Sequence, residues 1–75
     1  MERKEFRQRI GRRKQNVKLA ELSHLLRLYG FEHDRTTGSH HIWIRGSEQI
    51  AIPSHRGQVK AVYVVKVLQA TEGED

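Results

Sequence analysis

The sequence contains no cysteine, a single proline and a single tryptophan among its 75 residues. Without cysteine the chain can form neither a disulfide framework nor a zinc–thiolate site, and this composition suits the reducing cytoplasm. No apolar run reaches membrane-spanning length, and no apolar stretch typical of a secretory signal follows the charged N-terminus. We therefore expect one small cytoplasmic domain without a membrane partner, because so short a chain has no room for a second core.

The positive charge of the chain is concentrated in its first sixteen residues. The formal net charge is +5, and residues 1–16 hold seven basic and two acidic side chains, whereas residues 17–75 hold seven of each. A basic chain of this size points to a polyanion as its partner, most simply a nucleic acid, with a merely solvated arm as the alternative. We expect a basic extension over 1–16, a globular domain over 17–71 and an acidic tail over 72–75.

The N-terminal extension carries only two apolar anchors, Phe6 and Ile10. Because these lie four residues apart, a short basic helix is possible there, although Gly11 weakens it. The pattern favours an arm of low order that becomes helical when it meets a partner.

Regular periodicity begins after this extension. Apolar residues recur on one face of a helix from about 17 to 29, with Asn16 as its N-cap and Gly30 as a left-handed C-cap. Alternation and turn residues then predict three short strands, over 31–35, 40–45 and 49–52. Pro53 ends the hydrogen bonding of the third strand because it has no N–H to donate.

The segment 58–70 fits two kinds of structure. Its many valines favour a strand on propensity, whereas the spacing of Ala61, Val64 and Leu68 fits one face of a helix. Thirteen residues are long for a strand and ordinary for a helix, so we favour a helix followed by a frayed acidic tail. The expected fold is α+β, with a three-stranded antiparallel sheet and two helices on one of its faces.

Two adjacent histidines, His40 and His41, follow directly on a turn. Gly38 supplies a backbone that can take a positive φ, and Ser39 can bond locally to the turn. The histidines thus lie where a loop becomes a strand, where the backbone is held and the side chains can still reach a substrate. Because imidazole gives and takes protons near neutral pH, we infer that this stretch carries the chemistry.

Strand alternation separates the two histidines. His40 has the parity of the isoleucines at 42 and 44, which we expect to face the core, and His41 has the parity of Trp43 and Arg45. An exposed histidine beside an aromatic that stacks a base and an arginine that holds a phosphate makes chemical sense. We favour His41 for proton transfer, with His40 as the alternative because the first residue of a strand can escape the core.

Four motifs resemble those of the HicA (YcfA-like) toxins, small bacterial mRNA interferases of toxin–antitoxin pairs. They occur in the order and near the spacing of that family, and the resemblance covers about 17–71, most of the chain. The motifs are Leu22 to Gly30-Phe31, Gly38-Ser39-His40-His41-Ile42-Trp43, Ile52-Pro53-Ser54-His55 and Lys66-Val67-Leu68-Gln69-Ala70. Residues 1–16 have no counterpart in the motifs, and Lys60-Ala61-Val62 replaces a usual glycine before the last helix.

The resemblance implies a fold like that of a double-stranded-RNA-binding domain, α-β-β-β-α, which supports the helix over 58–70. It also implies a metal-independent endoribonuclease in the cytoplasm, inhibited by a HicB-type antitoxin that covers the site. The histidine of the family's Gly-Ser-His pattern corresponds to His40, so the resemblance favours His40 as the site histidine. Neighbouring strand residues point to opposite faces, so His40 and His41 do not readily chelate one ion, and we expect no metal site.

Candidate RNA contacts surround the histidines. The partner is expected to be mRNA or another single- or double-stranded RNA, held by a stacking aromatic, a loop histidine and basic side chains: Trp43, Arg45, His55, Arg56 and Lys60. Two rival hypotheses remain, a non-catalytic RNA-binding module on the same fold and a structural interaction domain whose basic arm binds protein or DNA.

Overall fold

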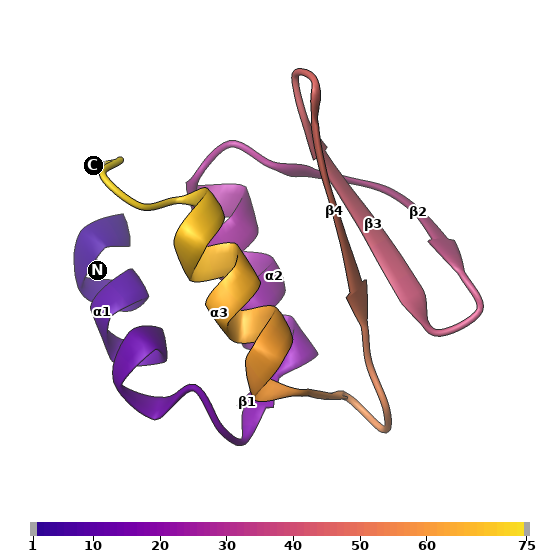
Figure 1. Ribbon diagram of the computed structural model, residues 1–75, viewed down its shortest axis with the longest axis horizontal. Helices are drawn as coiled ribbons and strands as arrows, with labels where there is room; N and C mark the ends of the chain where they lie inside the picture. The colour runs from indigo at the N-terminus through magenta and orange to yellow at the C-terminus, as the bar shows by residue number, and fades with distance from the viewer. Residues whose placement is uncertain (1, 75) are drawn as a thin grey trace.

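The computed structural model describes residues 2–74, and this part of the chain forms three helices, a three-stranded sheet and a short two-stranded ribbon. Figure 1 shows the sheet on one side of the molecule, α2 and α3 next to it, and α1 beyond them. The elements in chain order are α1 (Arg3–Arg13), β1 (Val17–Lys18), α2 (Leu19–Leu28), β2 (Glu32–Thr37), β3 (His40–Arg45), β4 (Glu48–Pro53), β5 (Gln58–Val59) and α3 (Ala61–Ala70). The expected α-β-β-β-α arrangement is therefore confirmed, from α2 to α3.

The sheet is an antiparallel meander in the order β2-β3-β4. Both hairpins close in two residues, and in each the first of the two is a glycine with positive φ, Gly38 at 61° and Gly46 at 58°. This is the pattern of type II′ turns, whose twist matches that of the strands. The turn at Gly38-Ser39 thus brings Thr37 opposite His40 and places the paired histidines at the beginning of β3.

Helix α2 begins two residues later than expected, at Leu19 rather than at the residue after Asn16. The residue that precedes it is Lys18, whose backbone N–H donates to the Glu21 carboxylate at 3.0 Å, so an acidic side chain in the first turn satisfies the free backbone group. At the other end Gly30 has φ 89°, and the Phe31 N–H returns to the Leu26 carbonyl at 3.0 Å. This left-handed ending is the one predicted, and it directs Phe31 into the core.

The ambiguous segment 58–70 contains a strand and a helix. Its first two residues form β5, which pairs antiparallel with β1 through Val17 opposite Val59. Helix α3 then begins at Ala61 and buries Val64 and Val67 completely. The helix is confirmed, and the β-branched residues are accommodated because burial against the other helices outweighs their propensity.

The core lies between the sheet and the helices, and it contradicts the predicted facing of β3. Trp43 is 2% exposed and packs with Ile50 and Ile52 of β4 in the core shared with the helices, whereas Ile42 lies outside that cluster. Both faces of β3 are apolar, and the larger tryptophan takes the helix side. By alternation, half-buried His41 therefore shares the helix-facing side with Trp43, and exposed His40 lies on the open face.

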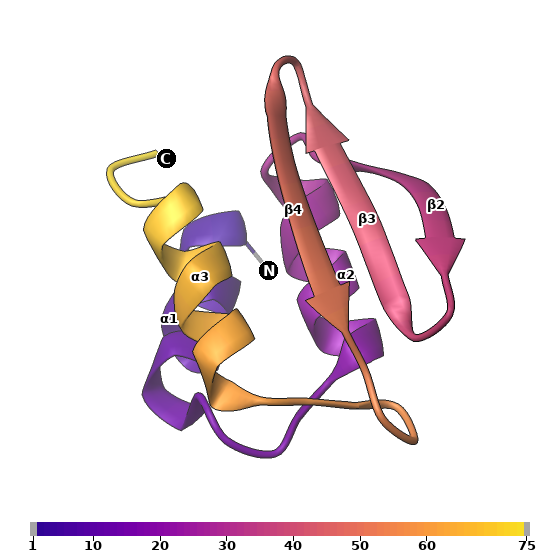
Figure 2. The ribbon, with the colours of Figure 1, turned by 45° about the vertical axis from the view of Figure 1, so that its right-hand side comes forward.

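The N-terminal extension is an integral helix, and the prediction of an arm of low order is wrong. Ile10 of α1 is 1% exposed and belongs to the core cluster. The Arg7 guanidinium donates to the Leu68 carbonyl and to the Thr71 hydroxyl, at 2.5 and 2.9 Å, which joins α1 to the end of α3. In both ribbon views α1 lies along α3 (Figures 1 and 2). A single well-placed isoleucine and a hydrogen-bonding arginine replace the long apolar face that the sequence lacks here.

The acidic tail is held against the sheet. Glu74 makes a bidentate ion pair with Arg45, with N–O distances of 2.6 and 2.8 Å. The expected fraying therefore does not apply to Glu74, while Asp75 and Met1 lie outside the described residues.

Candidate active site

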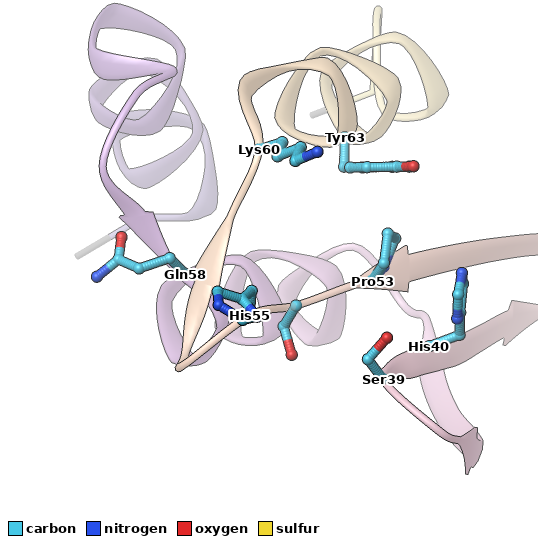
Figure 3. Close-up of a pocket in the computed structure, with 8 residues that line it drawn as sticks. Ser39, His40, Pro53, His55, Gln58, Lys60 and Tyr63 are labelled. Carbon is cyan, nitrogen blue, oxygen red and sulfur yellow. The ribbon is translucent and has the colours of Figure 1, made fainter.

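A cavity of about 490 Å³ opens where β3 begins, β4 ends and α3 starts. Figure 3 shows His40 on the sheet side, Tyr63 on the first turn of α3, and His55 and Gln58 on the segment that joins β4 to α3. The wall consists of side chains that can donate protons or carry positive charge, around one proline: Ser39, His40, Pro53, Ser54, His55, Gln58, Lys60 and Tyr63. Of the predicted site residues, the cavity therefore collects Ser39, His40, His55 and Lys60.

His40 is the histidine of the pair that faces this cavity. It lies opposite Pro53 in the register of β3 and β4, and its side chain is exposed. Within residues 2–74 no side chain or backbone group hydrogen-bonds the His40 ring. Both ring nitrogens are therefore available to a ligand.

His41 is held by hydrogen bonds on both ring nitrogens. Its Nδ1 lies 3.1 Å from the Thr36 hydroxyl, and its Nε2 lies 3.0 Å from the Ser54 hydroxyl. The Thr36 hydroxyl also bonds His33 Nε2 at 2.9 Å. Three hydrogen bonds thus connect exposed His33 to Ser54 in the wall of the cavity. They run from His33 through the Thr36 hydroxyl and the His41 ring.

The backbone around the cavity is fixed by short-range bonds. The Ser54 N–H donates to the Ser39 carbonyl at 3.0 Å, so the end of β4 is tied to the β2–β3 turn. His55 and Gln58 exchange both backbone hydrogen bonds across the Arg56-Gly57 turn, at 2.9 and 3.0 Å. His55 therefore lines the cavity from a closed turn, a well-defined position for a loop residue.

The charge in the cavity is positive and unopposed. The Lys60 ammonium is the only full positive charge in its wall, and no carboxylate of the described chain lines it. Lys60 makes no ion pair in residues 2–74. A cavity of this character suits an anionic group such as a phosphate.

Two predicted RNA contacts lie elsewhere. Trp43 is buried in the core, where the Arg27 guanidinium covers its ring at 5.1 Å, so its face is not open to a base. Arg45 lies at the opposite end of β3, where it bonds Glu74, Glu48 and the Tyr29 carbonyl. The hydrogen bonds from Glu74 and then Glu48 raise the pKa of Arg45 well above its ordinary value, as expected for a structural ion pair.

Sequence reasoning missed several residues of this site, among them Ser54, Tyr63 and Thr36. Ser54 and Tyr63 line the cavity, and Thr36 holds His41, yet none of them was singled out. Ser54 had a local signal, because it lies between Pro53 and His55 in a matched motif. Tyr63 had none, since it reads as one more apolar residue of α3 and reaches the cavity only through the fold.

Two further properties of the described chain bear on the kind of site. Within residues 2–74, no three histidine, aspartate or glutamate side chains gather as a potential metal site. Over the same residues, no helix has the length and apolar character needed to span a membrane.

A comparison with protein families matches residues 20–71 to the family described as the HicA toxin of bacterial toxin–antitoxin systems. This match covers more than half of the chain, from α2 to just beyond α3, and it leaves α1 and β1 outside. A search of curated proteins and a search of solved structures each gave no match.

Proposed function

This chain belongs to the HicA toxin family, the toxin half of a toxin–antitoxin pair, and on that premise we propose that it is a metal-independent endoribonuclease that cleaves mRNA. The observation that carries the proposal is the cavity at the beginning of β3, which combines His40, His55 and Lys60 and has no carboxylate among the described residues in its wall. Proton-transfer groups and positive charge are the two requirements for cleaving RNA through its own 2′-hydroxyl.

We assign the general base to His40. In this reaction the 2′-oxygen of RNA attacks the adjacent phosphorus, the 5′-oxygen leaves, and the products are a 2′,3′-cyclic phosphate and a 5′-hydroxyl end. The base must take the proton of the 2′-hydroxyl as the bond to phosphorus forms. His40 suits this role because its ring is exposed in the cavity and free of protein hydrogen bonds within residues 2–74.

The other groups of the cavity divide the remaining tasks. The Lys60 ammonium stabilises the extra negative charge of the phosphorane, as cations do in phosphoryl transfer. A proton for the leaving 5′-oxygen comes from His55 or Tyr63, which both line the same cavity. Replacing each of them by Gln and Phe, respectively, separates these two donors.

His41 acts here as a positioning residue. Its hydrogen bond to Ser54 orients a hydroxyl that lines the cavity, while its other nitrogen is held by Thr36. When Nε2 donates to Ser54, the Ser54 hydroxyl is free to donate to a phosphate oxygen; the other tautomer reverses the bond. A phosphate in the cavity therefore selects the first arrangement.

Membership of the family supports a proposal for the biological setting. A toxin that degrades mRNA acts in the cytoplasm, and a HicB-type antitoxin inhibits it by covering the cavity. Binding there would shield His40 and Lys60 together, so that inhibition needs no change in the fold.

The test is cleavage of a defined single-stranded RNA by the purified protein in the presence of excess chelator. We expect fragments that end in cyclic phosphate and 5′-hydroxyl, and no cut where the nucleotide 5′ to the scissile phosphate carries 2′-deoxyribose. Fragments with 5′-phosphate ends, or cleavage of the deoxy-substituted RNA, would contradict the mechanism. RNA binding without any cleavage would favour the non-catalytic RNA-binding module instead.

A further inference from the structure

A second cavity, of about 600 Å³, lies beside the first. It shares three wall residues with the first cavity, His55, Gln58 and Lys60. In Figure 3 the Gln58 side chain points away from Tyr63 and Pro53, toward the side of β5 on which β1 lies. The segment from His55 to Lys60 is therefore a common wall, with one cavity on each side.

The second cavity is also positive. Lys18, Arg56 and Lys60 contribute to its wall, and none of the carboxylates in residues 2–74 does. None of these three cations makes an ion pair in the described chain, although other cations such as Arg13 and Arg45 do. Val59 and Ala61 add an apolar part to the same wall. A cationic rim with an apolar patch suits a nucleotide, whose phosphate and base require these two environments.

The backbone of this wall is unusual. Within residues 2–74, only three residues other than glycine have positive φ, and two of them, Asn16 at 57° and Arg56 at 53°, line this cavity. Arg56 and Gly57 are the central residues of the closed turn between His55 and Gln58, and both have positive φ. Asparagine or glycine suits the first of these positions better than arginine does. An arginine in a strained position, with its side chain in a cavity, indicates that the side chain is used.

Part of this wall comes from the segment that the family match leaves out. Gln15, Asn16 and Lys18 precede residue 20, and they are held in place by the pairing of Val17 with Val59. The Leu19 N–H also donates to the Gly57 carbonyl at 2.8 Å, which ties the start of α2 to the turn that carries Arg56. The extension thus completes a cavity next to the candidate active site.

We propose that the second cavity binds the nucleotide next to the scissile phosphate of single-stranded RNA. Lys18 and Arg56 hold its phosphate, Val59 and Ala61 contact its base, and Lys60 lies between this phosphate and the one that reacts. This inference rests on the proposed ribonuclease function for the identity of the first cavity, and it gives Lys18, which precedes the matched residues 20–71, a part in substrate binding.

The test is binding of a fluorescent 2′-O-methyl RNA decamer, which lacks the nucleophile, measured by anisotropy between 50 and 200 mM salt. The variants are Arg56→Gly, which removes the charge and relieves the backbone, and Lys18→Gln. Each should weaken binding several-fold and reduce the slope of log affinity against log salt by about 0.7, the value for one lost contact to a single strand. The control is Lys4→Gln, an exposed cation of α1 outside both cavities, which should leave the slope unchanged. An unchanged slope in both Arg56→Gly and Lys18→Gln would overturn the proposal.

Cleavage separates this proposal from the one on which it rests. A dinucleotide carries only the scissile phosphate, whereas a tetranucleotide also carries the neighbouring phosphate that Lys18 and Arg56 are proposed to hold. Arg56→Gly should therefore shrink the advantage in kcat/KM of the longer substrate. If the protein binds RNA with the expected slopes and cleaves none, the ribonuclease function fails and the binding cavity stands. If it cleaves RNA and Arg56→Gly keeps the full advantage of the tetranucleotide, the second cavity fails and the ribonuclease function stands.

Discussion

The two ends of β3 differ in whether the positive side chains near them make ion pairs. At the Arg45 end, one guanidinium bonds two carboxylates and a backbone carbonyl, and it lies over the Phe31 ring at 4.4 Å. At the His40 end, Lys60 and the neighbouring Arg56 have no ion pair in residues 2–74, and no carboxylate of that part of the chain lines either cavity.

This difference distinguishes charges that stabilise the fold from charges that remain available to bind a ligand. A paired arginine joins the tail, the end of α2 and the β3–β4 hairpin, so its removal should affect stability. An unpaired lysine in a cavity contributes little to folding and remains available to a phosphate. Substitutions at the two ends should therefore affect different measurements.

The largest effect is expected from Lys60→Ala at the open end. Among residues 2–74, Lys60 carries the only full positive charge in the wall of the first cavity. Its loss should lower kcat/KM for RNA cleavage about 100-fold, because the phosphorane is no longer stabilised. The midpoint of urea unfolding should stay the same, since the Lys60 side chain is exposed. Steady-state cleavage and urea titration measure the two quantities, with Lys4→Ala as the matched control. A loss of less than twofold would show that Lys60 does not act on the reacting phosphate.

A smaller effect is expected from Thr36→Val, which breaks the hydrogen-bond chain to His41. Valine has nearly the shape of threonine and cannot bond His41 Nδ1, so Ser54 is oriented less well and kcat should fall about tenfold with KM nearly unchanged. Thr36→Ser keeps the hydroxyl and should restore most of the activity. Equal activity in the valine and serine variants would remove His41 from its positioning role.

At the closed end, Arg45→Met should act on stability. Methionine keeps an apolar stem against Phe31 but removes the ion pairs, so the free energy of unfolding should fall by about 1 kcal/mol. Cleavage of RNA should change by less than twofold, because Arg45 lies away from the cavity. A large loss of cleavage in a stable Arg45→Met protein would instead restore Arg45 as an RNA contact.

The smallest effect concerns Glu74 and acid. The hydrogen bond from Arg45 lowers the pKa of Glu74 below its usual value of 4.5, so the folded state favours the ionised carboxylate. This contribution is present above the unfolded pKa and is lost as the pH falls through the lower folded pKa. Between pH 5 and pH 3, the wild type should lose about 0.5 kcal/mol more stability than Glu74→Gln, as expected for a partly exposed pair that water still screens. Parallel acid titrations of unfolding that superimpose would show that the tail is not held in solution.

Local patterns in the sequence predicted most elements between 17 and 70. Gly38 and Gly46 indicated the positions of both hairpins, because a two-residue turn needs a residue with positive φ and glycine adopts this conformation readily. The same local reasoning could not predict helix α1, because Ile10 is buried against segments far along the chain. Gly11 lies inside the helix and does not end it, and a Cβ added at this position would make an ordinary van der Waals contact with Leu68.

The sequence predicted several of the residues that gather near the candidate site, but the direction in which the side chains of β3 point was predicted wrongly. The motif placed His40 and His41 together, but the choice between them depended on which face of β3 meets the helices. Isoleucine on one face and tryptophan on the other gave no clear preference, and the observed packing reverses the predicted facing. Arg45 was chosen because it has the strand parity of His41 and an arginine can hold a phosphate, whereas its partner Glu74 is 29 residues away and could not be anticipated.

The most direct test of the account compares His40→Ala with His41→Ala in cleavage of one defined RNA. We expect His40→Ala to lose activity about 100-fold or more, as for a general base, and His41→Ala to lose about tenfold, as for a residue that acts through Ser54. Both proteins should unfold at nearly the wild-type denaturant concentration. Full activity in His40→Ala together with complete loss in His41→Ala would contradict the assignment and make His41 the catalytic base.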